Sequence, residues 1–529
     1  MSARTLLRSG RVVDGTGAPG RPADVLIEDG TITAVEAPGQ LDGADAAVRE
    51  LAGAVLCPGF IDVHSHADNA PLLAEDDQSK ITQGVTTEVV GNCGFSLAPV
   101  EDAHREALQG LLGRIFPPLE GRWSSLPELF ARTDAAGYVT NYAPLVGHHA
   151  LRVAAIGMAD GAPEPEQLVA MRRSAEAAFA AGAFGLSSGL IYPPGLFAGA
   201  AEIHTLAAAL PAGRPYVTHM RGEGRMLLDS VAEAVRVGEV SERPVQISHL
   251  KAAGRAVWGR MGEVLDLLDA ARGRGVDITH DVYPYLAGST MLTATLPPWF
   301  QEGGNPSVMR RLADPQTVAR LRRDVESDDG SWENHVAACG WAGIVVASSR
   351  SHAHDGLSLQ AIADRAGLEP FEALVDVLRT EELNASMIIF SMREEDLVEA
   401  LVHPLTMIGS DGLPPGGGGR PHPRMWGTFP RVLSRYVRET GALSLEEAVR
   451  KMTSLPARRF GLANRGQVRP GAVADLVVLD PGTVHDEADY DDPVRPARGI
   501  IDVLVGGRLA VDAGRYMGER AGRRLVPSP

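Results

Sequence analysis

GFIDVHSHAD, residues 59–68, places His64 and His66 two positions apart at the end of an apolar run. In a β-strand this spacing puts both side chains on the same face. Parallel barrels keep their sites at the carboxyl ends of their strands, and two neutral imidazoles there make half of a zinc site. The segment therefore predicts a metal-bearing barrel strand. The alternative is a pair of histidines that are simply hydrogen-bonded in a core.

Four other apolar runs also end in a residue that can bind a metal or carry a proton. VTTEVVGNCG contains Cys93, RPYVTHM contains His219, RPVQISHL contains His249 and LTMIGSDG contains Asp411. One such residue is commonly structural, and the alternative for Cys93 is a buried, inert thiol. Because the carboxyl ends of parallel strands share one edge, their repetition predicts a single metal site.

Apolar strands alternate with helical segments through the middle of the chain, which indicates a parallel sheet covered by helices. Eight strands would fit a closed (β/α)₈ TIM-type barrel over residues 58–464. The strands are expected at 60–66, 85–92, 141–147, 184–189, 215–219, 244–249, 277–283 and 405–411.

Both ends of the chain contain short alternating runs separated by glycine-rich turns. Residues 1–57 and 465–529 are therefore predicted to form one small β-sandwich domain. Residues 287–346 break the strand–helix rhythm and are predicted to be an insertion that caps the barrel mouth. The glycine-rich stretch 411–427 is predicted to be a loop.

The composition narrows the class of protein. The 529 residues carry a formal net charge of −17, which disfavours nucleic acids and anionic membranes as partners. Three cysteines make no disulfide framework, and the sequence shows neither a signal peptide nor a membrane-spanning run. We expect a cytoplasmic protein. The oligomeric state stays open.

The sequence resembles the amidohydrolase superfamily and, within it, the N-acyl-D-amino-acid deacylases (D-aminoacylases). The resemblance runs over essentially the whole chain. It rests on PGFIDVHSHAD, TTEVVGNCGFSLAP, GLSSGLIYPPG, VTHMRGEG, ISHLKAAG, DVYPYLAGST, IGSDG and RPHPRMWGTFPRVL. The HxH pattern points only to the superfamily, whereas the Gly-Asn-Cys-Gly and Tyr-Pro-Pro-Gly segments point to the deacylases.

This resemblance implies a zinc enzyme that hydrolyses N-acyl-D-amino acids to a D-amino acid and a carboxylate. It implies one tightly held Zn²⁺ on Cys93, His219 and His249, and a second, weaker position at His64 and His66. Many members of the superfamily bridge two metals with a carboxylated lysine on strand four. Strand four here, AFGLSSGL, has no lysine, so Cys93 is expected to replace it. The number of metal ions is left open.

Asp411 matches the catalytic acid and base, which takes a proton from water and returns it to the leaving amine. Its alternative is a helix N-cap, and the two roles are compatible. The resemblance also implies substrate contacts for a further group, whose members each have a structural alternative: Lys251, Tyr192, Tyr283, Ser289 and Arg424.

Side-chain preference is not determined by the sequence. An apolar pocket would favour N-acetyl-D-Met, D-Leu or D-Phe, and an extra arginine would favour D-Glu or D-Asp, with Arg424 and residues 287–346 as the places to look. The nearest alternative function is that of a cyclic-amide hydrolase such as a hydantoinase or dihydropyrimidinase, which predicts the bridging lysine. A non-catalytic barrel scaffold would have lost the ligands, and none is missing.

Overall fold

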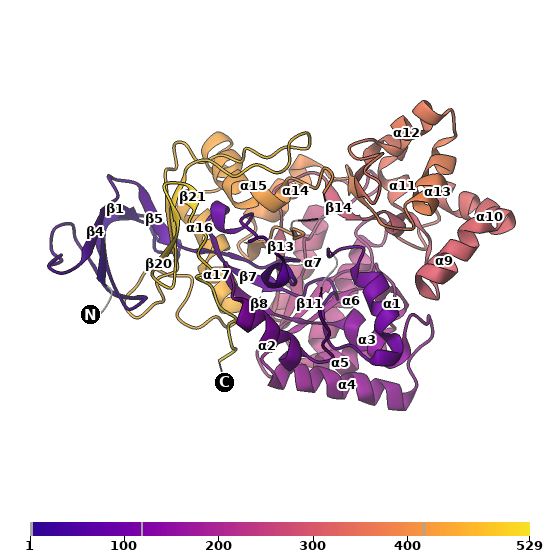
Figure 1. Ribbon diagram of the computed structural model, residues 1–529, viewed down its shortest axis with the longest axis horizontal. Helices are drawn as coiled ribbons and strands as arrows, with labels where there is room; N and C mark the ends of the chain where they lie inside the picture. The colour runs from indigo at the N-terminus through magenta and orange to yellow at the C-terminus, as the bar shows by residue number, and fades with distance from the viewer. Residues whose placement is uncertain (1–3, 118–119, 415, 417, 529) are drawn as a thin grey trace.

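The computed structural model describes residues 4–117, 120–414, 416 and 418–528. The protein is elongated, with a β-sheet at one end, a parallel α/β body in the middle and a mostly helical unit at the other end (Figure 1). No helix in these residues is both long and apolar enough to cross a lipid bilayer.

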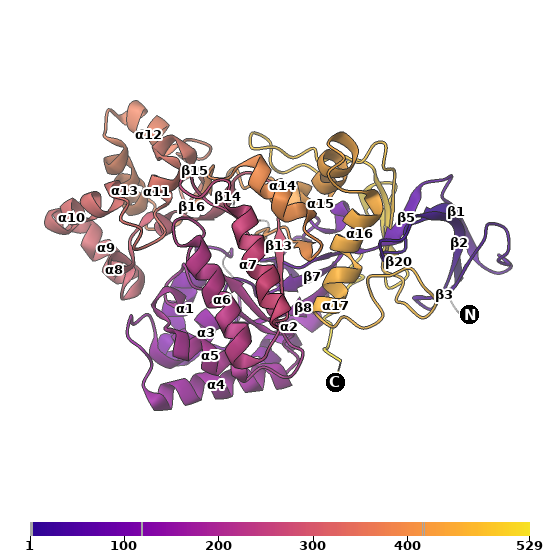
Figure 2. The ribbon, with the colours of Figure 1, turned by 180° about the vertical axis from the view of Figure 1, so that it is seen from behind.

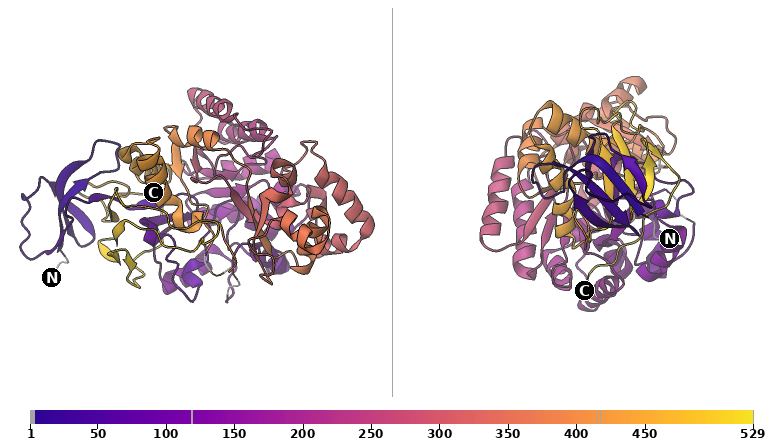
Figure 3. Two further views of the ribbon diagram at one scale, coloured as in Figure 1. Left: turned by 90° about the horizontal axis from the view of Figure 1, so that it is seen from above. Right: turned by 90° about the vertical axis from the view of Figure 1, so that its left-hand side faces the viewer.

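The sheet at one end is made by both ends of the chain, as the sequence predicts. It is one continuous nine-stranded sheet rather than the predicted sandwich of two sheets, because β5 pairs with β1 on one side and with β18 on the other. Its core draws Leu7, Val25 and Leu56 together with Leu476 and Leu504. Figure 3 shows the indigo and yellow strands side by side. The strands are β1 (Arg4–Val12), β2 (Arg21–Glu28), β3 (Thr31–Glu36), β4 (Ala47–Glu50), β5 (Val55–Pro58), β18 (Leu476–Leu479), β19 (Ile500–Val505), β20 (Arg508–Asp512) and β21 (Arg515–Tyr516).

The central body contains a parallel strand within each of the eight predicted runs. All residues of these strands are buried, as expected for parallel strands that are covered on both faces. The strands are β6 (Phe60–Asp62), β7 (Val85–Val90), β8 (Asn141–Pro144), β9 (Val146–Gly147), β10 (Leu186–Gly189), β11 (Tyr216–His219), β12 (Val245–Ile247), β13 (Ile278–Val282) and β17 (Thr406–Ile408).

These strands do not pair into the closed ring that the sequence predicts. They form a three-stranded sheet, β6-β7-β8, and a six-stranded sheet, β17-β13-β12-β11-β10-β9. The two sheets are linked through the run 141–147, because Leu145 between β8 and β9 donates its backbone N–H to the Val90 carbonyl at 2.8 Å. Between β17 and β6, the Asp62 carboxylate accepts the Ser410 N–H at 2.8 Å in place of a ladder bond, and one parallel bridge pairs Ser65 with Gly412.

Helices cover the outside of the central strands (Figure 2). The helix α4 shows why these segments are helical. Glu164 and Gln167 form a capping box at its start, and Met171, Ala175 and Ala178 form its buried face. The helices are α1 (Arg105–Leu112), α2 (Leu126–Ala136), α3 (His148–Ile156), α4 (Pro165–Ala180), α5 (Ala200–Ala208), α6 (Leu227–Ser241), α7 (Met261–Gly273), α14 (Glu394–Val402), α15 (Arg424–Arg431), α16 (Leu445–Met452) and α17 (Ser454–Arg459).

The helical unit at the far end lies between β13 and α14. A three-stranded antiparallel sheet in the order β14-β16-β15 ties it together. The unit therefore extends past residue 346 as far as β16. Its elements are β14 (Gly288–Met291), α8 (Pro298–Gln301), α9 (Gly304–Ala313), α10 (Pro315–Glu326), α11 (His335–Cys339), β15 (Ile344–Ser349), α12 (Leu359–Ala366), α13 (Pro370–Thr380) and β16 (Ala385–Ile389).

Candidate active site

The structure brings together all six residues that the sequence singled out for metal binding and proton transfer. Each lies at or just after the carboxyl end of a central strand, and each side chain is buried. Strands far apart in sequence thus converge on one point. The residues are His64 and His66 after β6, Cys93 after β7, His219 at the end of β11, His249 after β12 and Asp411 after β17.

Three of these residues have a left-handed backbone although none is glycine. The φ angle is +52° at Cys93, +37° at His249 and +49° at Asp411. Such conformations cost roughly 1–3 kcal/mol each and persist where the surrounding structure enforces them. They turn the chain sharply as it leaves the strand, and the side chains meet in the centre.

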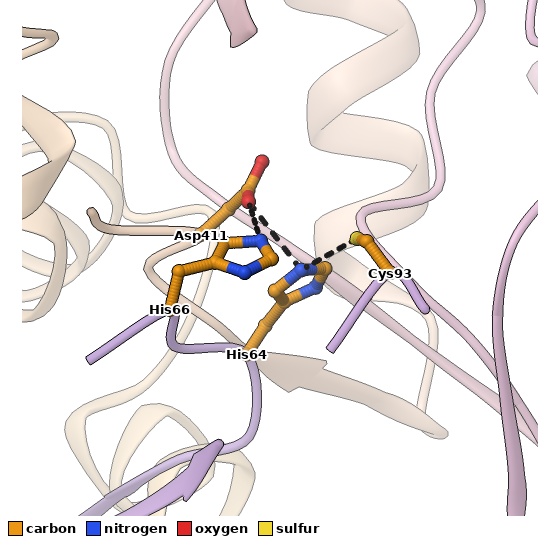
Figure 4. A group of neighbouring side chains, drawn as sticks. All are labelled: His64, His66, Cys93 and Asp411. Carbon is orange, nitrogen blue, oxygen red and sulfur yellow. Dashed lines mark hydrogen bonds and ion pairs between the residues drawn. The ribbon is translucent and has the colours of Figure 1, made fainter. Parts of the chain in front are cut away.

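The side chains form two groups that share Cys93. In the first, Asp411 Oδ1 lies 3.3 Å from His64 Nε2 and 3.2 Å from His66 Nε2, and Cys93 Sγ lies 3.2 Å from His64 Nε2 (Figure 4). In the second, Cys93 Sγ lies 3.7 Å from His249 Nε2, and His219 completes the group. Within each group the candidate ligand atoms all lie within 4.8 Å of one another.

The donor set fits zinc. Imidazole, thiolate and carboxylate are the ligands that zinc takes in proteins. Both ring nitrogens of His219 are buried without a hydrogen-bond partner among the described residues. Buried polar atoms are nearly always partnered, so a lone-pair nitrogen of His219 is available to a cation.

The charges of the cluster favour a cation as well. Burial raises the pKa of the Cys93 thiol, but the positive charge of His64 and the neighbouring rings of His219 and His249 outweigh burial and hold it well below its ordinary value. Burial likewise raises the pKa of Asp411, and the charges of Arg424 and His64 reverse the effect. A thiolate and a carboxylate therefore face the same buried space.

Two carboxylates behind the cluster hold its histidines. Asp281 Oδ1 accepts the backbone N–H of His249 at 2.9 Å and lies 3.4 Å from the ring atom His64 Nδ1. Glu223 Oε1 lies 3.0 Å from His249 Nδ1 and 2.6 Å from Lys251 Nζ. A carboxylate that accepts the second ring N–H fixes which imidazole nitrogen is free for a metal. The sequence analysis did not single out Asp281, which is the fourth residue of β13, Ile-Thr-His-Asp-Val.

Three of the five predicted substrate residues line one pocket with the cluster. Tyr192, Ser289 and Arg424 border this space together with His66, Cys93 and Asp411. Arg424 Nη1 lies 2.8 Å from Asp411 Oδ2, and Arg424 Nη2 donates to the Ser289 carbonyl at 3.1 Å.

The other two predicted residues, Lys251 and Tyr283, lie outside the lining of that pocket. The Lys251 ammonium is engaged by Glu223 behind His249. The Tyr283 ring lies between two cations, 5.6 Å from Lys251 Nζ and 4.8 Å from the Arg424 guanidinium carbon. Arg114, which sequence reasoning did not single out, does line the pocket.

Comparison with known sequences gives a consistent result. The profile of the Amidohydrolase family matches residues 47–511. A D-aminoacylase of Alcaligenes xylosoxydans xylosoxydans is 39% identical over 98% of this chain and 97% of its own length. An N-acyl-D-glutamate deacylase of the same organism is 37% identical over 95% of this chain and 92% of its own.

Solved structures agree with the sequence matches. A D-aminoacylase structure described as having a binuclear metal centre superposes with a TM-score of 0.82, at 36% identity over 99% of both chains. The N-acyl-D-glutamate deacylase of Bordetella bronchiseptica, complexed with zinc and a phosphonate inhibitor, gives a TM-score of 0.81. It is 35% identical over 99% of this chain and 100% of its own.

Proposed function

The chain belongs to the amidohydrolase family and is a metal-dependent amidohydrolase of D-aminoacylase type, and from this premise we propose that it hydrolyses N-acyl-D-amino acids. The products would be a D-amino acid and a carboxylate. One observation carries the proposal: Cys93 belongs to both ligand groups, and Asp411 sits in one of them beside Arg424. Full-length relatives that are D-aminoacylases support the substrate class.

Zinc would be held tightly by Cys93, His219 and His249. A second, weaker position would be formed by His64, His66 and Asp411 with the shared Cys93. When bound, zinc supplies a Lewis acid that polarises the amide carbonyl and makes water a better nucleophile near neutral pH. The number of zinc ions bound per chain would depend on whether the Cys93 thiolate serves one ligand group or both.

Asp411 would carry the proton. Because Arg424 and the histidines hold its pKa well below the ordinary range, it is ionised at neutral pH and can accept a proton from the attacking water. It would then donate that proton to the nitrogen of the leaving amine. A single carboxylate thus acts first as base and then as acid.

Arg424 would bind the α-carboxylate of the substrate. It is buried, it lines the pocket and it touches Asp411, so a carboxylate bound there lies beside the proton carrier. Tyr192 and Ser289 border the same space. The Tyr192 ring packs on the His219 ring at 5.0 Å, and its hydroxyl accepts a hydrogen bond from Thr290 at 2.8 Å. For Lys251 and Tyr283, the geometry favours a positioning role behind His249.

A cyclic-amide hydrolase is the second candidate, since it would use the same type of fold. A hydrolase of this type requires a carboxylated, and therefore anionic, lysine on strand four. The corresponding strand, β10, reads Leu-Ser-Ser-Gly, and the thiolate of Cys93 stands between the ligand groups instead. This difference favours the linear amide.

The proposal is tested with purified, zinc-loaded enzyme and matched N-acetyl-D- and N-acetyl-L-amino acids. We expect turnover of the D series and a loss of roughly 10³-fold or more in kcat for Asp411→Asn, in line with removal of a general acid–base. Equal or faster turnover of the L series would exclude a D-aminoacylase. Hydantoin and dihydrouracil serve as the cyclic comparison.

A further inference from the structure

The active-site pocket contains a second arginine besides Arg424. Arg114 follows α1 and borders the pocket next to Ile115. Its guanidinium reaches the helical unit between β13 and α14, where Nη1 donates to Thr293 Oγ1 at 3.1 Å. Nη2 donates to Asn305 Oδ1, and the Asn305 side chain is itself held by the Gly110 carbonyl at 3.2 Å. Two residues of the helical unit, Thr293 and Asn305, thus hold the Arg114 guanidinium.

All partners of Arg114 are electrically neutral. Within the described residues, no carboxylate forms an ion pair with its guanidinium, and its Nε has no hydrogen-bond partner. Burial lowers the pKa of Arg114 to about 10, and no negative group offsets the effect. The pocket therefore holds a fixed positive charge without a counter-charge.

The other two cations at the site are already neutralised. Arg424 pairs with Asp411 at 2.8 Å, and Lys251 pairs with Glu223 at 2.6 Å. A desolvated charge is costly when it is unpaired, and a carboxylate is the natural partner of a guanidinium. A ligand carboxylate that reached Arg114 would remove this cost.

The positions of the two arginines indicate which carboxylate each would bind. The α-carboxylate of an N-acyl amino acid is attached to the same carbon as the scissile nitrogen, so it must lie near the proton carrier. Arg424 touches Asp411, whereas the contacts of Arg114 are with Thr293 and Asn305. A side-chain carboxylate lies one or two carbons farther from the scissile nitrogen than the α-carboxylate does.

We propose that Arg114 binds the side-chain carboxylate of an acidic substrate, so that the enzyme prefers N-acyl-D-glutamate or N-acyl-D-aspartate. This inference rests on the proposed function. It assigns the specificity to a residue that comes from the segment after α1 and is oriented by Thr293 and Asn305. Arg114 contributes binding and leaves the proton transfer to Asp411.

The test compares N-acetyl-D-glutamate with N-acetyl-D-glutamine, which differ by one charge at nearly constant shape. The zinc-loaded full chain should favour the glutamate in kcat/KM by at least about tenfold, since a charge-assisted bond contributes about that much. Arg114→Met should reduce the ratio by at least about tenfold, mainly through KM, and Arg114→Lys should retain part of it. Arg122→Met is the matched control, because Arg122 is an exposed arginine of the same segment that pairs with Asp102.

Equal use of the two substrates by the unaltered enzyme would overturn the inference. So would an Arg114→Met variant that loses both substrates in the same proportion, because this would mean that Arg114 binds the α-carboxylate or only supports the pocket. Calorimetry with glutarate and its monoamide separates this inference from the proposed function, since binding needs no turnover. Tighter binding of glutarate that disappears in Arg114→Met would support the Arg114 site even if no D-substrate were hydrolysed, and equal binding would refute it.

Discussion

The substitution Glu223→Gln tests whether Lys251 acts through Glu223 or contacts the substrate itself. Glu223 Oε1 lies 2.6 Å from Lys251 Nζ and 3.0 Å from His249 Nδ1. The Lys251 side chain is 10% exposed and the Glu223 side chain 7%. Glutamine keeps the shape of the side chain but removes its charge, so the Lys251 ammonium would be left buried without an ionic partner.

Two magnitudes follow from this geometry. Breaking one side of a buried ion pair costs roughly 3–5 kcal/mol in the free energy of unfolding. The zinc affinity should also fall by roughly 10–100-fold, which is typical when a metal-bound histidine loses its carboxylate partner. The reason is tautomeric, because His249 Nδ1 lies 3.0 Å from Glu223 Oε1 and 2.7 Å from Lys251 Nζ. The carboxylate favours a proton on Nδ1 and a free lone pair on Nε2, the nitrogen that lies 3.7 Å from Cys93 Sγ. Without the carboxylate, the ammonium would donate to Nδ1 and favour a proton on Nε2.

The assay is a double-mutant cycle with Glu223→Gln, Lys251→Met and the double variant. Denaturant unfolding measures the free energy, chelator competition measures the zinc affinity, and steady-state kinetics measure KM. The double variant removes both charges, so we expect it to recover roughly 2–3 kcal/mol relative to the sum of the single variants. A Lys251→Met variant that raised KM strongly with unchanged zinc affinity, together with additive free energies, would refute the positioning role and restore Lys251 as a substrate ligand.

Three further outcomes are expected. Cys93→Ala should bind less than one zinc per chain by metal analysis, since Cys93 belongs to both ligand groups; stoichiometric zinc would contradict its role as a ligand. Burial raises the pKa of Glu333 from 4.5 to about 7, so its contribution to stability is present at low pH and is lost as the pH rises through about 7. Glu333→Gln should therefore gain up to about 3 kcal/mol over the unaltered protein between pH 5 and pH 8 in unfolding measurements, and a constant difference would contradict this. Gly409→Ala places a Cβ 2.5 Å from His64 Cβ and should lower the melting temperature by an amount equivalent to about 1–3 kcal/mol; an unchanged melting temperature would show that the strand can shift freely.

The sequence by itself determined the parallel α/β class, the runs that contain its strands and the six residues that converge at their ends. The reason is local. Strand spacing places His64 and His66 on one face, and parallel strands bring their carboxyl ends to the same edge whatever connects them. For the same reason a metal site could be expected before any contact was known.

Only the tertiary structure decided how the strands pair and which charges neutralise each other. The ring of central strands is not closed between β17 and β6, where the Asp62 carboxylate accepts the Ser410 N–H, and the terminal strands join one sheet. The sequence shows that Lys251 is a cation. Its contact with Glu223 depends on two loops that meet behind His249. Arg114 stands out only because its hydrogen-bond partners Thr293 and Asn305 are neutral. Pairing of this kind depends on distances between segments far apart in the chain, which local sequence patterns do not encode.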